Sequence, residues 1–187
     1  MLKKIVMRIF TVTGCMLCFC GFLLVEPAAP KRGTLIVCWS FNYGSLDFLS
    51  QVSDLIGAVR IDKVISEDYN QILPYTEFSA TVIHPIYNCT DGQTILIKII
   101  GIKNAVRQIE AMDDPLPRLG EEFLIFARKD QEAEGYFIVG GPQGRFAYND
   151  GKVTSLWLID RSLSKASKAI ENRNVEDLIH EIKSYMQ

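Results

Sequence analysis

Residues 123–158 read FLIFARKDQEAEGYFIVGGPQGRFAYNDGKVTSLWL, and this stretch points to one fold class more strongly than the rest of the chain. It contains four short runs bounded by turn residues: Phe123–Arg128, Tyr136–Val139, Arg145–Tyr148 and Val153–Leu158. Their apolar, aromatic and β-branched composition is typical of strands. Asn149, Asp150 and Gly151, between the last two runs, form a hairpin signal. The stretch therefore predicts four short antiparallel strands.

Three longer segments upstream also have strand-like patterns: Leu55–Ile65, Tyr75–Ile83 and Thr94–Ile100. The third is apolar on both faces except at Lys98, which predicts a central strand. Gly57 lies early in the first segment and marks a bulge or a close backbone approach. The run Thr34–Ser40 favours a further strand, and Ser45 suits the cap of a brief helix over Leu46–Val52.

The period of the apolar residues changes near the C-terminus. They recur there every three or four positions, at Val175, Leu178, Ile179, Ile182 and Tyr185. Asn174 precedes this pattern as an N-cap, so the segment predicts an amphipathic helix. We expect a mainly β (α+β) domain over residues 31–160, built as a small OB-like antiparallel barrel or as a sandwich. The C-terminal segment, residues 161–187, should pack on this barrel.

Residues 1–30 predict export from the cytoplasm. Three basic residues precede an uncharged run, Ile9–Val25, whose 17 residues lie near the lower limit for a membrane-spanning helix. The basic flank places the N-terminus in the cytoplasm and everything after Glu26 outside. The segment is therefore a signal peptide or a signal anchor, and the domain is secreted or held on the membrane through residues 9–25.

Three fates of this segment remain open. A signal peptidase needs small residues before the cut, but Ala28 and Ala29 are flanked by Pro27 and Pro30. The stretch from Val12 to Cys15 resembles a bacterial lipobox, in which Cys15 would be acylated and become the new N-terminus. The third fate is an uncleaved anchor. Each of them gives the same topology.

Composition narrows the function of the exported part, whose 157 residues have the length of one domain. The whole chain has 20 basic and 22 acidic residues; without Lys3, Lys4, Arg8 and Glu26 the balance is 17 to 21, a net charge of −4. Nothing in this balance favours nucleic acid or anionic lipid as a partner.

Three of the five cysteines lie in the apolar run, which leaves Cys38 and Cys89 in the exported part. Two cysteines in an oxidising compartment could form one disulfide, and the alternative is that both are small buried hydrophobes. The spacing of the cysteines indicates neither a metal site nor a thiol redox pair. We therefore expect no cofactor and no metal.

The order of patterns over residues 46–140 resembles a known module. Ser53–Ile56 opens a long strand, Tyr75 and Thr76 open the next, and Gly120–Ala127 reads GEEFLIFA. This order is similar to that of netrin-like domains and tissue inhibitors of metalloproteinases, and of many uncharacterised exported bacterial proteins. The resemblance implies an OB-type barrel. Inhibitors in this family use a cysteine at the mature N-terminus and several disulfides. This chain departs on both counts, and only cleavage at Cys15 would give it an N-terminal cysteine.

Two loops are candidates for partner binding. One is Gly101–Leu119, which two aspartates and two prolines predict to be a long surface loop, with one helical turn near Ala105–Ala111. The other is Gly140–Arg145, which sits between two strands and therefore predicts a structural turn rather than a phosphate-binding loop. Arg145, Phe146 and Tyr148 after this turn have the residue types that anchor partners, although the two aromatics also suit a core.

The sequence presents no catalytic set. His84 and His180 have no oriented partner at a telling spacing, and the acidic loop around Asp113 and Asp114 lacks EF-hand spacing. Asn88, Cys89 and Thr90 match the pattern of a glycosylation acceptor, which is used only in a eukaryotic secretory pathway. We expect a non-enzymatic interaction module of a bacterial cell envelope, binding a protein or a glycan. The alternative is an envelope hydrolase or a protease-inhibitor-like protein.

Overall fold

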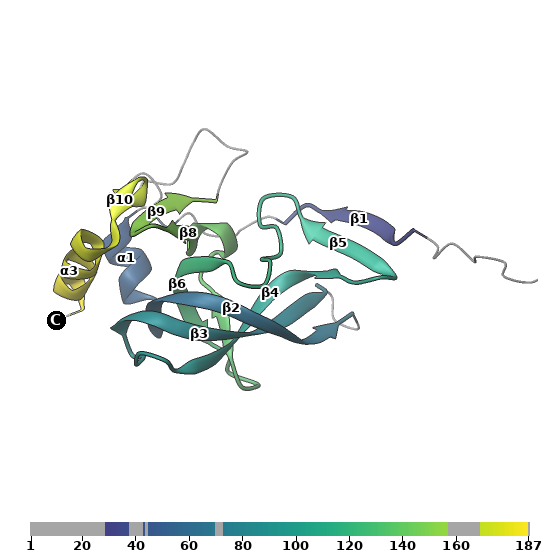
Figure 1. Cartoon of the computed structure of the whole chain (residues 1–187), viewed down its shortest axis with the longest axis horizontal. Coiled ribbons are helices and arrows are strands. Elements are labelled where there is room, and N and C mark those ends of the chain that lie inside the picture. Colours follow the sequence, from purple (N-terminus) through teal and green to yellow (C-terminus); the bar gives the residue numbers. More distant parts are fainter. Residues whose placement is uncertain (1–28, 38–42, 44, 70–72, 157–168, 187) are drawn as a thin grey trace, which may run out of the picture.

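The computed structural model describes residues 29–37, 43, 45–69, 73–156 and 169–186. Five strands form its centre: β2 (Leu55–Asp68), β3 (Tyr75–Tyr87), β4 (Thr94–Lys103), β6 (Glu122–Lys129) and β7 (Tyr136–Ile138). The order around the sheet is β4, β3, β2, β6, with β7 paired to both β6 and β4. These five strands form a closed barrel, so the barrel is confirmed and the sandwich is not what the chain forms (Figure 1).

The short strand β7 closes the barrel. It runs parallel to β4, with Ile97 opposite Tyr136 and Lys98 opposite Phe137. On its other side it runs antiparallel to β6, where Ala127 faces Ile138. Closure pairs the edges of β4 and β6 that an open sheet would expose.

Alternation along the strands fills the barrel interior. Ile95, Ile97 and Ile99 of β4 belong to one buried apolar cluster with Phe78 and Ile125, among others. Because successive strand residues point to opposite faces, Lys98 lies on the outside of the barrel. The expected central position of this strand is confirmed by its pairing with β3 on one side and β7 on the other.

A second apolar cluster lies outside the barrel, and the helices pack in it. The elements around it are α1 (Leu46–Gln51), η2 (Gly141–Gln143), β8 (Arg145–Asn149), β9 (Lys152–Ser155), β10 (Arg173–Asn174) and α3 (Val175–Tyr185). Asn174 caps α3 by accepting a 2.8 Å hydrogen bond from the Glu176 N–H. The predicted helix is confirmed: Val175, Leu178 and Ile182 are buried in this cluster, and Ile179 packs against it.

Two local signals in the sequence are also confirmed. Asp150 and Gly151 both have positive φ and connect β8 to β9 as a two-residue hairpin loop. The register of β2 shifts at Gly57, where an added Cβ would lie 3.1 Å from the Cys89 sulfur and 3.2 Å from the His84 carbonyl oxygen. Ser45 caps α1 as expected, with its Oγ accepting from the Phe48 N–H.

The region Gly101–Leu119 corrects the sequence prediction, because it contains a strand rather than a long loop with a helical turn. The strand is β5 (Arg107–Ala111), joined to the end of β4 by a tight turn. The Asn104 side chain forms this turn by accepting 2.9 Å hydrogen bonds from the N–H groups of Val106 and Arg107. An asparagine can thus start a hairpin without a glycine.

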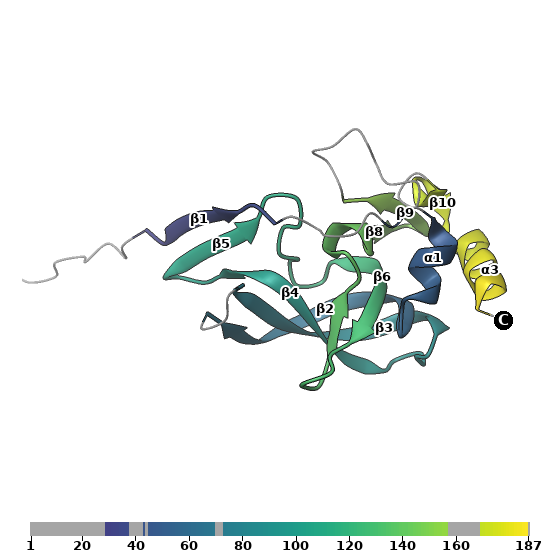
Figure 2. The ribbon, with the colours of Figure 1, turned by 180° about the vertical axis from the view of Figure 1, so that it is seen from behind.

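A strand from the N-terminal side completes this extension. It is β1 (Lys31–Leu35), which runs parallel to β5 with Lys31 opposite Arg107. The observed strand therefore begins three residues before Thr34, where the sequence predicts it to start, and it ends at Leu35. We call β1, β5 and the end of β4 the arm; it projects from one end of the barrel (Figure 2).

Residues 1–28, which carry the predicted signal or anchor segment and Cys15, lie outside the described residues. Cys38 lies outside them as well. Among the helices that the structure describes, none has the length and apolar character needed to cross a membrane.

Candidate functional site

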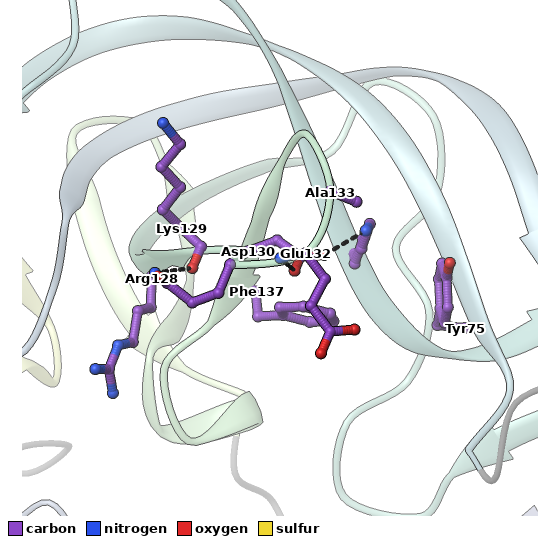
Figure 3. Close-up of a pocket in the computed structure, with 9 residues that line it drawn as sticks. Tyr75, Arg128, Lys129, Asp130, Glu132, Ala133 and Phe137 are labelled. Atoms are coloured by element: carbon purple, nitrogen blue, oxygen red, sulfur yellow. Dashed lines mark hydrogen bonds and ion pairs between the residues drawn. The ribbon is translucent and has the colours of Figure 1, made fainter.

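A pocket of about 580 Å³ opens on the outside of the barrel, against β3, β4 and β7. It is lined by Tyr75, Lys98, Phe137 and the segment Arg128–Ala133 (Figure 3). We call it the Lys98 pocket. Its floor is Lys98, which is only 6% exposed although it lies on the outer face of the sheet.

An ion pair fixes the Lys98 side chain. Its Nζ lies 2.5 Å from Oδ2 of Asp130, and both side chains are largely buried. Burial alone lowers the pKa of Lys98, but the hydrogen bond and the charge of Asp130 outweigh it and raise the pKa. The same hydrogen bond lowers the pKa of the Asp130 carboxyl. Both groups are therefore charged around neutral pH and compensate one another.

Two aromatic rings flank the ammonium group of Lys98. Its Nζ lies 5.5 Å from the ring centroid of Tyr75 and 5.4 Å from that of Phe137, within the range of cation–π attraction. Phe137 is nevertheless 41% exposed, so part of its ring faces solvent. A large apolar surface beside polar groups is a typical recognition feature.

The loop between β6 and β7 forms the rim of the pocket and is held by its own hydrogen bonds. The Asp130 N–H donates to the Gly135 carbonyl at 3.0 Å, and the Glu132 N–H donates to Asp130 Oδ1 at 2.9 Å. Gln131, Glu132 and Ala133 are exposed along this rim. Asp130 thus has two roles, since it pairs with Lys98 and also shapes the loop.

A second, smaller hollow of about 340 Å³ lies beyond Phe137. It shares Arg128 and Phe137 with the Lys98 pocket and is otherwise lined mainly by apolar side chains, among them Tyr43 and Phe48. The rings of Tyr43 and Phe48 stack with centroids 5.8 Å apart. Phe137 therefore separates two adjoining depressions.

Arg145 requires a correction, because it does not lie on the surface. It is 1% exposed, and its Nη2 donates to Asp114 Oδ1 at 2.6 Å and to the Pro115 carbonyl at 2.5 Å. Its guanidinium carbon also lies 5.0 Å from the ring centroid of Phe123. A cation buried in this way anchors the segment after β5 to β8 and cannot meet a partner at the surface.

The two aromatic candidates beside it differ from one another. Phe146 is fully buried and packs edge-on against Phe126 with centroids 6.0 Å apart, so it belongs to the core. Tyr148 is half-buried and meets the ring of His84 edge-on at 5.6 Å. The turn before them, Gly140–Arg145, is largely buried and connects β7 to β8. Any partner-binding role of Tyr148 stays a prediction.

The remaining candidates are spread over the fold. His180 is exposed on α3, while Asp114 is the buried partner of Arg145. In the described part of the chain, no group of three or more His, Cys, Asp and Glu side chains could hold a metal ion. Within the described residues the Cys89 thiol forms no disulfide; it donates to the Ile56 carbonyl at 3.2 Å, and burial raises its pKa. Its pairing with Cys38 stays a prediction.

The sequence alone does not predict the Lys98 pocket, although one of its residues stands out in the sequence. Lys98 is the single charge in the apolar strand TILIKII, and a lone charge there indicates a covered polar site. Asp130 and Phe137 carry no such signal, because their meeting with Lys98 depends on how β7 closes the barrel.

Neither a protein-family model nor a curated protein sequence matches this chain.

Proposed function

We propose that this protein is a non-enzymatic binding module of the bacterial cell envelope, tethered through residues 9–25, and that it binds a glycan in the Lys98 pocket. The strand order β2, β3, β4, β7, β6 and back to β2 supports an OB-like barrel, with one parallel pair between β4 and β7. The same order supports kinship with netrin-like and metalloproteinase-inhibitor-like barrels. Barrels of this architecture bind oligosaccharides on the face of their second and third strands.

The observation that carries the proposal is the position of the two aromatic rings. Tyr75 and Phe137 lie on the outer face of the second, third and fifth strands of the barrel, beside the loop that joins the fourth to the fifth. That face and that loop are where OB barrels bind ligands. The exposed part of Phe137 offers an apolar surface to one face of a sugar ring.

The polar groups of the pocket suit an uncharged, hydroxyl-rich ligand. Gln131 offers both donors and acceptors, Glu132 offers acceptors and Arg128 offers donors, which is the set that sugar hydroxyls can use. The buried charges of Lys98 and Asp130 neutralise one another and so demand no counter-charge from the ligand. A protein partner is the other class that the pocket could serve, and direct binding measurements separate the two.

The test uses the domain from residue 29 to 187 and a soluble hexamer of N-acetylglucosamine as an uncharged probe, measured by calorimetry. We expect binding that Phe137→Ala and Tyr75→Ala each weaken by roughly 1 to 3 kcal/mol, as for other aromatic stacking contacts. Met112→Ala is the control, because Met112 is 54% exposed and does not line the pocket. Equal binding by all variants, or none by the wild type, argues against the glycan site.

The hydrolase and the protease inhibitor remain alternatives without a supporting contact. The His84 ring packs edge-on against the Tyr148 ring. Profiling against peptide, ester and glycan substrates tests the hydrolase. Turnover that His84→Ala abolishes would reverse our preference.

A further inference from the structure

The arm begins close to the predicted membrane segment. Only five residues separate Val25, the last residue of the apolar run, from Lys31, the first of β1. Even fully extended, this connection spans at most about 20 Å. If residues 9–25 lie in the bilayer, the start of β1 therefore lies within about 20 Å of the hydrocarbon core, a distance that includes the headgroup layer.

The pairing of β1 with β5 places the rest of the arm beside the start of β1. Lys31 lies opposite Arg107, and its N–H donates to the Val106 carbonyl at 2.9 Å. The turn of Asn104 that joins β4 to β5 is thus fixed beside the start of β1. Figures 1 and 2 show this tip at one end of the long axis, with α3 and the C-terminus at the other.

The tip carries exposed apolar side chains. Val106 is 66% exposed in the turn, and Tyr69 and Leu73, at the neighbouring end of the β2–β3 hairpin, are 49% and 43% exposed. The Arg107 guanidinium lies 3.6 Å from the ring centroid of Tyr69, which joins the hairpin end to the arm. Aromatic and aliphatic side chains beside cations are typical of surfaces at the membrane interface.

Basic residues gather at this end although the exported part as a whole is acidic. Lys31 and Arg32 are exposed on β1, and Lys103 and Arg107 flank the turn. Acidic side chains lie among them: Glu110 pairs with Lys103 at 3.2 Å, and the Glu67 carboxylate accepts from the Asn104 amide. Asp68 also lies nearby at the end of β2. Each basic residue near an anionic leaflet contributes about fivefold to residence at the surface.

We propose that the tip of the arm, Val106 with Lys31, Arg32 and Lys103 around it, rests on the lipid headgroups and sets the orientation of the barrel on the membrane. This inference rests on the proposed tether and is independent of what the Lys98 pocket binds. It makes β1 a rigid connection rather than a flexible linker. The opposite end, with α3, then points away from the bilayer.

The test is lysine footprinting on the full chain reconstituted in vesicles of phosphatidylethanolamine and phosphatidylglycerol. Acetylation by an N-hydroxysuccinimide ester is measured by mass spectrometry. Lys152 and Lys183, both exposed toward the far end, serve as internal controls. We expect Lys31 and Lys103 to react about fivefold more slowly relative to these controls in vesicles than in detergent.

Two variants sharpen the result. Val106→Asp should restore the reactivity of Lys103 in vesicles, because it places a carboxylate against the headgroups. Phe48→Asp, at a residue 43% exposed on α1, should leave the footprint unchanged. A chain that floats with the vesicles but shows equal reactivity at all four lysines overturns the inference alone. A chain that does not float overturns the tether and the inference together.

Discussion

Replacing Arg145 by alanine should be among the most damaging single changes in this domain. The Asp114 side chain is only 3% exposed, and the substitution leaves its carboxylate without the guanidinium partner. It also removes the hydrogen bond to the Pro115 carbonyl, so the segment after β5 loses its attachment to β8. Breaking a buried ion pair from one side costs about 3 to 5 kcal/mol. A domain of this size has only about 5 to 15 kcal/mol in total.

The assay is urea unfolding of the domain from residue 29 to 187, followed by far-ultraviolet circular dichroism. Arg128→Ala is the matched control, because Arg128 is an exposed arginine on the neighbouring strand β6 and should change stability by no more than about 0.5 kcal/mol. The Nε and Nη1 atoms of Arg145 have no hydrogen-bond partner within the described chain. Removing both charges at once should therefore cost less than removing Arg145 alone.

The double variant Arg145→Met with Asp114→Ala tests this last point, since apolar replacement of a buried pair is often close to neutral. A loss below about 1 kcal/mol for Arg145→Ala would contradict the burial argument. A double variant less stable than Arg145→Ala would contradict the assignment of the cost to the unpaired carboxylate.

Two further outcomes concern stability. The pKa of Asp130 is lowered and that of Lys98 raised, so their contribution is fully present between the ordinary values of the two groups. It is lost as the pH falls through the lowered value or rises through the raised one. Asp130→Asn should make the acid limb of the pH profile shallower, and an unchanged profile would refute the pair. Deleting residues 174–187 removes three buried side chains, each of which contributes roughly 1.5 to 3 kcal/mol to the free energy of unfolding before entropy costs. The melting temperature should therefore fall. An unchanged melting temperature would show that α3 does not stabilise the barrel.

Much of the barrel could be predicted because its strands carry their pattern locally. Apolar alternation marked β2, β3, β4 and β6, and the loop Asp150–Gly151 marked the last hairpin. Strand β5 could not be predicted, because its sequence RQIEA is mostly polar and most of its residues are half-exposed. Its strand state comes from the turn at Asn104 and from pairing with β1, 76 positions away.

The candidate site could be predicted only in part, for a related reason. The residue type of Arg145 suits a partner-binding surface, but Asp114 and the Pro115 carbonyl, about 30 positions earlier, satisfy its guanidinium inside the fold. Lys98 was visible as an anomaly in an apolar strand, but its partner Asp130 is 32 positions away. Local patterns identify a buried charge as unusual, whereas the closure of the barrel determines what it meets.

The most direct test of the glycan site is a titration of the isotope-labelled domain with the N-acetylglucosamine hexamer, followed by amide chemical shifts. We predict shifts confined to the Lys98 pocket, at Tyr75, Phe137 and the loop from Asp130 to Gly135. Phe137→Ala should move these shifts to a higher hexamer concentration, as expected for binding weakened by roughly 1 to 3 kcal/mol, while the rest of the spectrum stays that of a folded domain. Shifts centred instead on β8 around Tyr148, or on the arm, would contradict the assignment of the pocket as the binding site.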